Sequence, residues 1–207
     1  MATDDHETHG SGEGPSPNGG EDGSESASAS TSSKSEPAPE SREDCDSNEQ
    51  LGAAVVTVSS TRSLEEDESG DAVVTALEAG EYDLATRELI ENGYDTVQSI
   101  VSRLVDRDDV DVVVTVGGTG LAEGDVTLEA VRPLLDKEME SFCDLFTRLC
   151  YEEVGTGVLC ARSMGGVVDG SPVFCLPDDV ATTQVATESI IVTETPRIVA
   201  SATPDDE

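Results

Sequence analysis

Hydrophobic and polar positions follow two different periods along most of the chain, one typical of strands and one typical of helices. Residues 53–58 (AAVVTV) and 110–116 (VDVVVTV) form nearly continuous β-branched runs, as expected of strands buried on both faces of a sheet. Three weaker patterns predict shorter or more polar strands at residues 83–89, 157–160 and 173–176. These runs predict a sheet with a hydrophobic layer on each side.

Apolar residues at helical spacing separate these strands. The first helix is expected to begin at an N-cap, Ser69, and to stop at Gly80. Because strands alternate with helices, the pattern predicts a three-layer α/β/α fold with a mostly parallel sheet. The remaining helices are expected at residues 95–105, 127–134, 138–151 and 179–192.

Composition divides the chain near residue 50. Residues 1–50 contain almost no Val, Ile, Leu or Phe and are rich in Ser, Gly, Glu, Asp and Pro. Such a segment cannot bury enough apolar surface to offset the entropy lost on ordering, so a disordered acidic tail is expected there. A single domain is expected at residues 51–195, followed by a loose C-terminal tail at residues 196–207.

The chain carries a formal net charge of −34. Residues 1–50 hold 13 acidic and two basic residues, and residues 51–207 hold 32 acidic and nine basic ones. The acidic residues are spread along the domain, which favours a protein adapted to a salt-rich cytoplasm, because salt screens the repulsion between them. Binding of a basic partner is the alternative. Nucleic-acid binding is not expected, since the chain has no basic stripe.

The cysteines follow no spacing typical of zinc or redox sites, and their odd number argues against a disulfide framework. Four of the five lie among apolar residues, so buried thiols in a reducing compartment are expected. The N-terminus lacks the apolar segment of a secretion signal, and no run approaches the roughly 18 apolar residues of a membrane span. A cytoplasmic protein without a membrane partner is therefore expected. The five cysteines are Cys45, Cys143, Cys150, Cys160 and Cys175.

A glycine-rich segment follows directly after the strongest strand pattern, at the sheet edge where α/β folds bind ligands. Its residues are Gly117, Gly118, Thr119 and Gly120. Glycines let the backbone approach an anion closely and leave N–H groups free to point at phosphate oxygens, and threonine adds a hydroxyl donor. The segment predicts a phosphate-binding loop. It is not a P-loop, since no GK[ST] follows, and GxGxxG is also absent.

Asp125 supplies a carboxylate beside this segment. A carboxylate fits next to a phosphate when a hard cation such as Mg²⁺ joins the two, which makes Asp125 a candidate metal ligand. The alternative is a plain turn between a strand and a helix, with Asp125 and Thr127 capping the helix. The glycines alone do not decide between these two interpretations.

A longer pattern around the glycines is more specific. Residues 117–149, GGTGLAEGDVTLEAVRPLLDKEMESFCDLFTRL, resemble the molybdopterin-binding family of molybdenum-cofactor biosynthesis, of the MoaB and MogA type. Supporting matches are TVSSTR at residues 57–62, Ser69-Gly70, Arg162 within CARSMGG, and FCLP at residues 174–177. The resemblance spans about residues 53–191, nearly the whole expected domain.

The resemblance implies a three-layer α/β fold, commonly a homotrimer, that binds molybdopterin. Active members transfer AMP from ATP to the terminal phosphate of molybdopterin and release pyrophosphate, with Mg²⁺ as cofactor. By this resemblance Asp125 would be the catalytic residue and would position the metal and the reacting phosphates. The glycine segment with Ser59, Ser69 and Gly70 would bind phosphate or nucleotide, and Glu138, Arg162 and Pro177 would contact the pterin.

Three positions depart from the family's usual pattern. Asn92 or Gly93 stands where members often carry an acidic residue, and an amide cannot supply a negative charge to a metal. Asp178-Asp179 replaces the usual Gly-Ser, so two carboxylates would oppose a phosphate unless a cation intervenes. Residues 141–144 (SFCD) replace Gly-Phe-Gly-Glu.

Three hypotheses about function follow from these patterns. The first is a Mg²⁺-dependent molybdopterin adenylyltransferase. The second is a non-catalytic molybdopterin-binding or scaffold protein of the same pathway. The third is an unrelated acidic α/β interaction module. The side chains that face the cavity above Asp125 are expected to discriminate between the first two.

Overall fold

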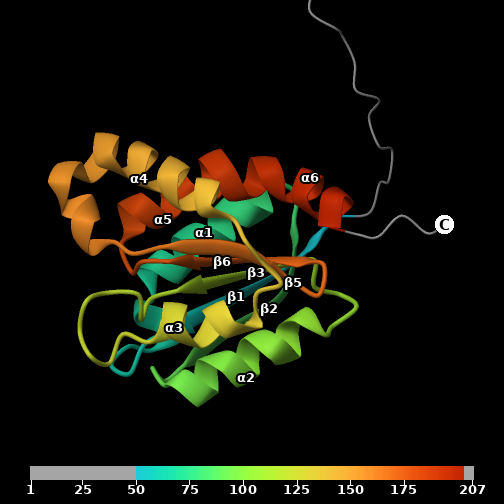
Figure 1. The fold of residues 1–207 in the computed structure, drawn as a ribbon, viewed down its shortest axis with the longest axis horizontal. Helices are drawn as coiled ribbons and strands as arrows, with labels where there is room; N and C mark the ends of the chain where they lie inside the picture. The colour runs from blue at the N-terminus through green and yellow to red at the C-terminus, as the bar shows by residue number, and fades with distance from the viewer. Residues whose placement is uncertain (1–49, 203–207) are drawn as a thin grey trace, which may run out of the picture. The chain divides into compact units, whose positions relative to one another are not determined.

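The structure is a computed structural model that describes residues 50–202, so the expected acidic tail up to residue 49 lies outside the described residues, as do residues 203–207. The described part contains strands and helices that alternate along the chain (Figure 1). In order they are β1 (Gly52–Val58), η1 (Leu64–Glu66), α1 (Glu68–Ala79), β2 (Asp83–Ile90), α2 (Tyr94–Val105), β3 (Val112–Val116), α3 (Thr127–Val131), η2 (Arg132–Leu134), β4 (Lys137–Glu138), α4 (Glu140–Val154), η3 (Gly155–Cys160), β5 (Met164–Val168), β6 (Ser171–Leu176), α5 (Val180–Ala186), η4 (Thr187–Ile191) and α6 (Val192–Ala202).

The strands form one six-stranded sheet in the order β2-β1-β3-β6-β5-β4. β1 pairs in parallel with β2 and β3, and β3 pairs in parallel with β6, whereas β5 is antiparallel to both of its neighbours. The chain runs outward from β1 to β2 and returns to the other side of β1 at β3. The sheet therefore has a topological switch point between β1 and β3.

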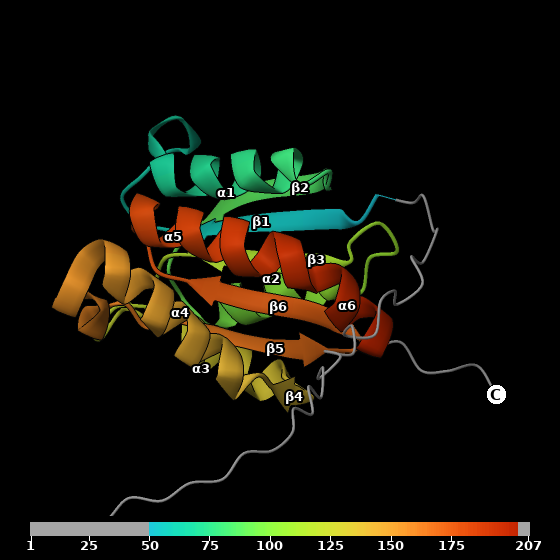
Figure 2. The same cartoon turned by 90° about the horizontal axis from the view of Figure 1, so that it is seen from above.

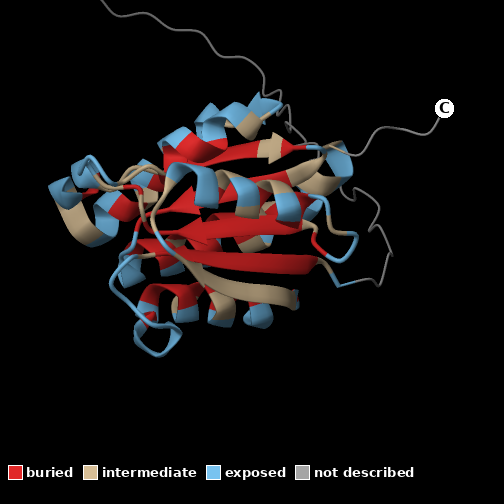
Figure 3. Ribbon diagram, turned by 90° about the horizontal axis from the view of Figure 1, so that it is seen from below, coloured by how far each residue is buried: buried red, intermediate tan, exposed pale blue. Residues whose placement is uncertain are grey.

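Helices cover both faces of this sheet. α1, α4, α5 and α6 lie on one face, and α2 and α3 lie on the other (Figures 1 and 2). Successive side chains of β1 reach opposite layers: Val55 belongs to the core cluster of Leu77 and Phe146, whereas Val56 belongs to the cluster of Val101. The central strands are buried on both faces, as Figure 3 shows. The predicted three-layer α/β fold with a mostly parallel sheet is confirmed.

The strand expected at residues 157–160 is wrong, because Gly155–Cys160 forms the 3-10 helix η3 at the end of α4. Two strands were not predicted, the two-residue β4 and the strand β5. β5 contains adjacent glycines, and a Cβ on Gly165 would lie 2.9 Å from the ring of Phe142. Gly165 lets α4 pack directly against the sheet, and Gly166 makes room for Leu135. Both glycines remove the side-chain alternation that would have marked a strand.

The predicted helices are present, with shifted ends. Asp67, and not Ser69, is the N-cap of α1: its side chain accepts a hydrogen bond from the N–H of Gly70, and Ser69 lies buried within the first turn. Gly80 ends this helix as predicted. α3 ends before Pro133, which lies in the following 3-10 turn. Both Asp and Ser suit an N-cap, so only the tertiary contacts of Asp67 decide between them.

The C-terminal helix extends beyond its predicted end. α5, the π-helix η4 and α6 follow one another without a break, so residues 196–202, which were expected to be loose, are helical. Pro196 lies inside α6 and lacks the N–H that would bond to the carbonyl of Val192. The hydroxyl of Tyr82 donates to that carbonyl at 3.1 Å. A contact from a distant turn thus satisfies the acceptor that proline leaves open.

Candidate anion-binding site

The loops that follow β1, β3 and β6 surround a cavity of about 570 Å³. The pairing register places Thr57, Val116 and Leu176 side by side, so the parallel strands end at one edge of the sheet. This edge includes the switch point between β1 and β3, where α/β sheets bind their ligands. Six residues that the sequence singled out line the cavity: Ser59, Gly118, Thr119, Gly120, Asp125 and Pro177.

Gly117 and Gly118 shape the start of the glycine loop, the name used below for residues 117–125. Both have positive φ angles, 96° and 63°, which favour glycine. A Cβ on Gly117 would lie 2.6 Å from the carbonyl oxygen of Val58, and a Cβ on Gly118 would lie 2.3 Å from Thr127 Oγ1. Backbone conformation and lack of space therefore both require glycine at these positions.

The carbonyl groups of the glycine loop are bound within the protein. Thr127 donates from its hydroxyl to the carbonyl of Gly117 and from its N–H to the carbonyl of Gly118, each at 2.9 Å. Further along, the N–H of Asp125 donates to the carbonyl of Ala122 at 3.0 Å. These bonds close the loop on itself ahead of α3.

Arg162, between η3 and β5, holds the middle of the same loop. Its Nε donates to the carbonyls of Thr119 at 2.8 Å and Gly120 at 3.0 Å, and its Nη2 donates to the carbonyl of Asp125 at 3.2 Å. The guanidinium also forms an ion pair with Glu129 of α3, at 2.6 Å. Hydrogen bonding to Arg162 lowers the pKa of the Glu129 carboxyl group.

At residues 118–120 the carbonyl groups are bound but the N–H donors are free. Within residues 50–202, the backbone N–H groups of Gly118, Thr119 and Gly120 have no hydrogen-bond acceptor. The Thr119 hydroxyl likewise has no partner in the described chain, although the residue is only 2% exposed. Successive unpaired N–H groups form a concave anion-binding surface. The loop thus presents three backbone donors and one hydroxyl at the wall of the cavity.

Asp125 is half-buried at the end of this wall. Its Oδ2 accepts a hydrogen bond from the N–H of Ala122 at 3.0 Å, and a Cβ on Gly120 would lie 2.5 Å from the same oxygen. The carboxylate is therefore held against the glycine loop by its own turn. The alternative interpretation, in which Asp125 caps the next helix, is not observed, since α3 begins at Thr127 without a side-chain cap.

Asn92 follows β2 and also lines the cavity. Its N–H donates to Ser60 Oγ at 3.2 Å, which ties it to the loop after β1. Its Oδ1 is enclosed and has no donor in the described part of the chain. A Cβ on Gly118 would lie 3.1 Å from this oxygen, so the amide borders the glycine loop. The residue that departs from the acidic family pattern therefore does face the site.

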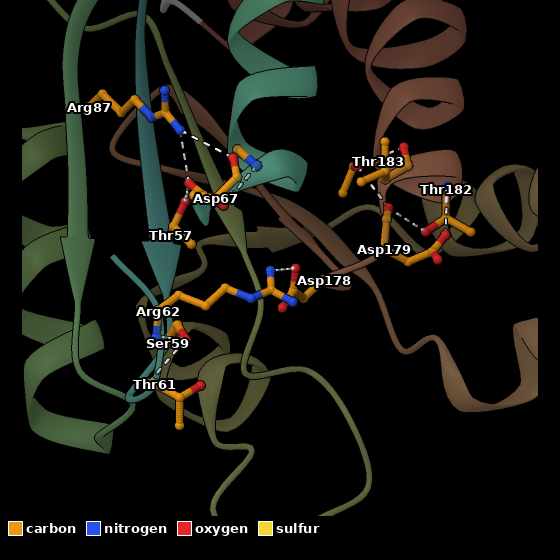
Figure 4. A network of polar contacts seen from close by, with 12 residues as sticks. Thr57, Ser59, Thr61, Arg62, Asp67, Arg87, Asp178, Asp179, Thr182 and Thr183 are labelled. Atoms are coloured by element: carbon orange, nitrogen blue, oxygen red, sulfur yellow. Dashed lines mark hydrogen bonds and ion pairs between the residues drawn. The ribbon is translucent and has the colours of Figure 1, made fainter. Parts of the chain in front are cut away.

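The two aspartates after β6 also line the cavity, and each has a partner (Figure 4). Arg62 Nη1 donates to Asp178 Oδ1 at 2.5 Å, which links the loop after β1 to the loop after β6. Asp179 Oδ1 accepts from the N–H of Thr182 at 2.9 Å and caps α5. Ser59 Oγ accepts from the N–H of Arg62 at 3.3 Å. These bonds fix the part of the cavity rim that the loops after β1 and β6 form.

The charge of the cavity wall is negative. Of the described residues that line it, Asp125, Asp178 and Asp179 are acidic and none is Lys, Arg or His. No three His, Cys, Asp or Glu side chains between residues 50 and 202 are grouped to hold a metal ion. Carboxylate oxygens are ligands that suit Mg²⁺, but the remaining ligands would have to come from phosphate oxygens and water. The donor set therefore fits a cation that enters together with a phosphate compound.

Ser69 and Gly70 do not line the cavity, and Gly70 instead borders the buried Asp67. The Asp67 carboxylate accepts from the hydroxyl of Thr57 at 2.6 Å and from the N–H of Gly70 at 3.0 Å, and it pairs with Arg87 at 3.0 Å. The sequence did not single out Asp67. Its only signal was its place just before Ser69-Gly70, at the expected start of a helix.

The other predicted site residues lie away from the cavity. Glu138 is exposed on β4 and pairs with Arg132 at 3.0 Å. Arg162 and Glu129 line a smaller hollow on the other side of the glycine loop. Gly117, the first residue of the glycine loop, is buried and does not line the cavity. The structure therefore does not bring Glu138 and Arg162 together with the residues that face the cavity.

Cys160 of η3 lines the cavity and was not predicted there. Its side chain is exposed, so the expectation of a buried thiol is wrong at this position. The same expectation is confirmed for Cys150 and Cys175, whereas Cys143 is half-buried. Cys45 lies outside the described residues.

Fold and cavity together define an α/β protein that presents a glycine loop with free N–H groups at the switch point of its sheet. A family described as a probable molybdopterin binding domain matches residues 54–197. Molybdenum cofactor biosynthesis protein B of Staphylococcus aureus is 37% identical over 150 residues, 71% of this chain and 89% of that protein. The protein of the same name from Bacillus cereus is 34% identical over 146 residues, 70% of this chain and 86% of that protein. The chain belongs to the molybdopterin-binding family of molybdenum-cofactor biosynthesis.

Solved structures agree with this membership. A crystal structure of a molybdenum cofactor biosynthesis protein B is 32% identical, has a TM-score of 0.72 and covers 74% of this chain and 96% of that chain. The tungsten cofactor synthesizing protein MoaB from Pyrococcus furiosus is 30% identical, with a TM-score of 0.66 and coverage of 74% and 97%. The resemblance stated from the sequence is confirmed. Among the described residues, no helix has the length and apolar character to cross a membrane.

Proposed function

We propose that the protein acts in molybdenum-cofactor biosynthesis, binds molybdopterin and Mg²⁺-bound ATP in the cavity, and transfers AMP from ATP to the terminal phosphate of molybdopterin. The observation that carries this proposal is the row of free N–H groups of Gly118, Thr119 and Gly120, with Asp125 beside it. Phosphoryl-group chemistry depends mostly on positioning and charge neutralisation, which such a wall provides.

The chain's own groups divide the work by their chemistry. The N–H groups and the Thr119 hydroxyl hold phosphate oxygens, because they are unpaired donors at the cavity wall. Asp125 orients the reacting phosphates from the end of the loop, and Ser59 and Pro177 border the ligand. When bound, Mg²⁺ neutralises charge between the phosphates and the carboxylates. Because the wall has acidic but no basic side chains, binding of polyphosphate depends on such a cation.

A second candidate function is molybdopterin binding without catalysis. Asn92 favours it, because an amide faces the loop where relatives often carry a carboxylate, and its Oδ1 has no donor from the described chain. Asp178 and Asp179 weigh against it, since two other carboxylates line the same cavity. We retain AMP transfer as the main proposal. A homotrimeric assembly in the cytoplasm belongs to this proposal through the family resemblance, and light scattering measures the assembly.

The test uses purified protein in molar KCl with molybdopterin, ATP and Mg²⁺. Asp125→Asn is expected to lower formation of adenylylated pterin by about 100-fold or more, the scale of losing one electrostatic contact to the transition state. Asn keeps an oxygen that accepts from the N–H of Ala122, so the turn is preserved while the charge is lost.

The matched control is Asp144→Asn, which removes one charge from an exposed position on α4 and is expected to leave the rate unchanged. Chromatography detects the adenylylated product, and pterin fluorescence reports binding. Pterin binding by the wild-type protein without AMP transfer would support the second candidate. Equal rates for Asp125→Asn and the wild-type protein would exclude the proposed role of Asp125.

A further inference from the structure

We infer that Arg162 is a positioning residue: it holds the glycine loop in the conformation that turns its N–H groups toward the cavity, with Glu129 fixing its guanidinium. This inference rests on the proposed function of the loop as a phosphate site. It assigns to Arg162 a role different from the pterin contact expected from the sequence.

The geometry of the peptide bond relates the bound carbonyl groups of the loop to its free N–H groups. In a trans peptide the C=O of one residue and the N–H of the next point in opposite directions. Arg162 holds the carbonyl of Thr119 at 2.8 Å, so the N–H of Gly120 points away from the guanidinium. Thr127 acts in the same way on the carbonyls of Gly117 and Gly118, and thus on the next two N–H groups. Three successive peptides are thus oriented by donors from Thr127 and Arg162.

Arg162 does not line the large cavity. Its guanidinium lines the smaller hollow with Glu129, whereas Gly118 and Thr119 line the larger cavity. Gly120 and Asp125 border both, so the loop lies between the cavity and the smaller hollow. Arg162 draws the carbonyls of Thr119 and Gly120 toward the smaller hollow and therefore turns the N–H of Gly120 toward the cavity.

The side chain of Arg162 is suited to hold several carbonyl groups at once. One guanidinium donates to three loop carbonyls and to a carboxylate, which uses its planar set of N–H donors. A lysine ammonium keeps the charge but cannot reach these four acceptors in a fixed plane. Glu129 contacts the guanidinium at 2.6 Å and is about half exposed, so it orients Arg162 without touching the loop carbonyls.

The test measures loop order directly in the full-length protein. Hydrogen exchange is followed at the amides of Ala122, Asp125 and Thr127, which donate within the loop or into it. Arg162→Lys is expected to accelerate their exchange about 10-fold or more while the amides of β1 and β3 keep their protection. Glu129→Gln, which keeps the carbonyl bonds, is expected to have a smaller effect. Unchanged loop exchange in Arg162→Lys would overturn the inference.

A binding measurement connects loop order to ligand. Inorganic pyrophosphate with MgCl₂ is titrated by calorimetry, and Arg162→Lys is expected to weaken binding about 10-fold. The matched control is Arg132→Lys, which alters another exposed ion pair, the one between Arg132 and Glu138 at 3.0 Å. This variant is expected to match the wild-type protein in both measurements. Lost affinity in Arg132→Lys as well would point to a general effect of altering an Arg–Glu ion pair and contradict the inference.

The outcomes separate this inference from the proposed reaction. Pyrophosphate binding that depends on Arg162, in a protein that transfers no AMP, would leave the inference standing and refute the adenylyltransferase. Absence of pyrophosphate binding by the wild-type protein would overturn the phosphate role of the loop. Where AMP transfer is measurable, Arg162→Lys is expected to raise KM for ATP, whereas Asp125→Asn lowers kcat.

Discussion

At the scale of single residues, burial controls the chemistry of two thiols. The side chain of Cys175 is fully buried in β6, and this burial raises the pKa of its thiol to about 12. Burial, with a smaller contribution from the charges of Asp179 and Glu153, raises the pKa of Cys150 to about 11. Both groups therefore remain protonated at neutral pH, where a thiol is a weak nucleophile. Cys160 is the exposed thiol at the cavity.

The raised pKa of Cys175 predicts a stability that falls in alkaline solution. The thiol ionises near its ordinary value of 9.0 in the unfolded chain but only near 12 in the folded one. The stabilisation that the Cys175 thiol gives the folded state is therefore fully present below pH 9. It is lost as the pH rises from about 9 toward 12. In this range, the free energy of unfolding should change less with pH in Cys175→Ala than in the wild-type protein. The difference in slope is up to about 1.4 kcal/mol per pH unit.

Urea denaturation at pH 8, 9 and 10 checks this prediction. Cys175→Ala is expected to cost about 1 kcal/mol at pH 8, because a buried group is lost. Cys160→Ala is the control, since its side chain is exposed and its removal leaves no internal gap. Parallel pH profiles for the wild-type protein and Cys175→Ala would show that Cys175 does not contribute to the alkaline loss.

At the scale of elements, the C-terminal helix depends on a contact with the turn before β2. Pro196 leaves the carbonyl of Val192 without its helical donor, and the Tyr82 hydroxyl replaces that donor. Burial also raises the pKa of Tyr82, so this hydroxyl remains a donor at neutral pH. The helix therefore passes through a proline because a residue more than a hundred positions earlier in the chain completes its hydrogen bonding.

Tyr82→Phe is expected to lower the free energy of unfolding by about 1 kcal/mol, because the Val192 carbonyl loses its hydrogen-bond donor while the ring remains. Tyr151→Phe, which removes a hydroxyl from a side chain 56% exposed on α4, is the control and should have little effect. Denaturation in urea measures both variants. Equal stability of Tyr82→Phe and the wild-type protein would mean that another group supplies the donor.

Elements also show how far local patterns reach. The runs at 53–58 and 110–116 became the central strands, and Gly80 ended α1, because these signals depend on neighbouring residues alone. β5 was missed because its glycines serve the packing of α4, and η3 was taken for a strand because its apolar residues are too few to show a period. Both errors concern segments whose conformation depends on tertiary packing.

At the scale of the whole molecule, acidic side chains far outnumber the basic ones that could pair with them. Seven arginines of the described residues form eight ion pairs, and these engage only eight acidic side chains. Residues 51–207 contain 32 acidic side chains in all, so most carboxylates have no such partner within the described chain. Repulsion among them opposes the compact state and weakens in molar salt, where the Debye length is about 3 Å.

The melting temperature is therefore expected to rise by several degrees or more when KCl is increased from about 0.05 M to 2 M, as circular dichroism would show. NaCl at equal ionic strength should have the same effect, because screening depends on ionic strength. A melting temperature that does not change with salt would contradict the adaptation to salt. It would favour the alternative, in which the acidic surface binds a basic partner.

Sequence alone determined the class of fold, the family and the position of the glycine loop. These depend on local properties: buried β-branched runs, glycines with positive φ, and a long ordered motif that follows them. The tertiary structure decided which side chains share the cavity. It brought Asn92 and Asp178 to the loop, moved Arg162 to the far side, and revealed Asp67 as a buried cap. Such contacts join residues far apart in the chain, and packing between elements sets them, which no local pattern records.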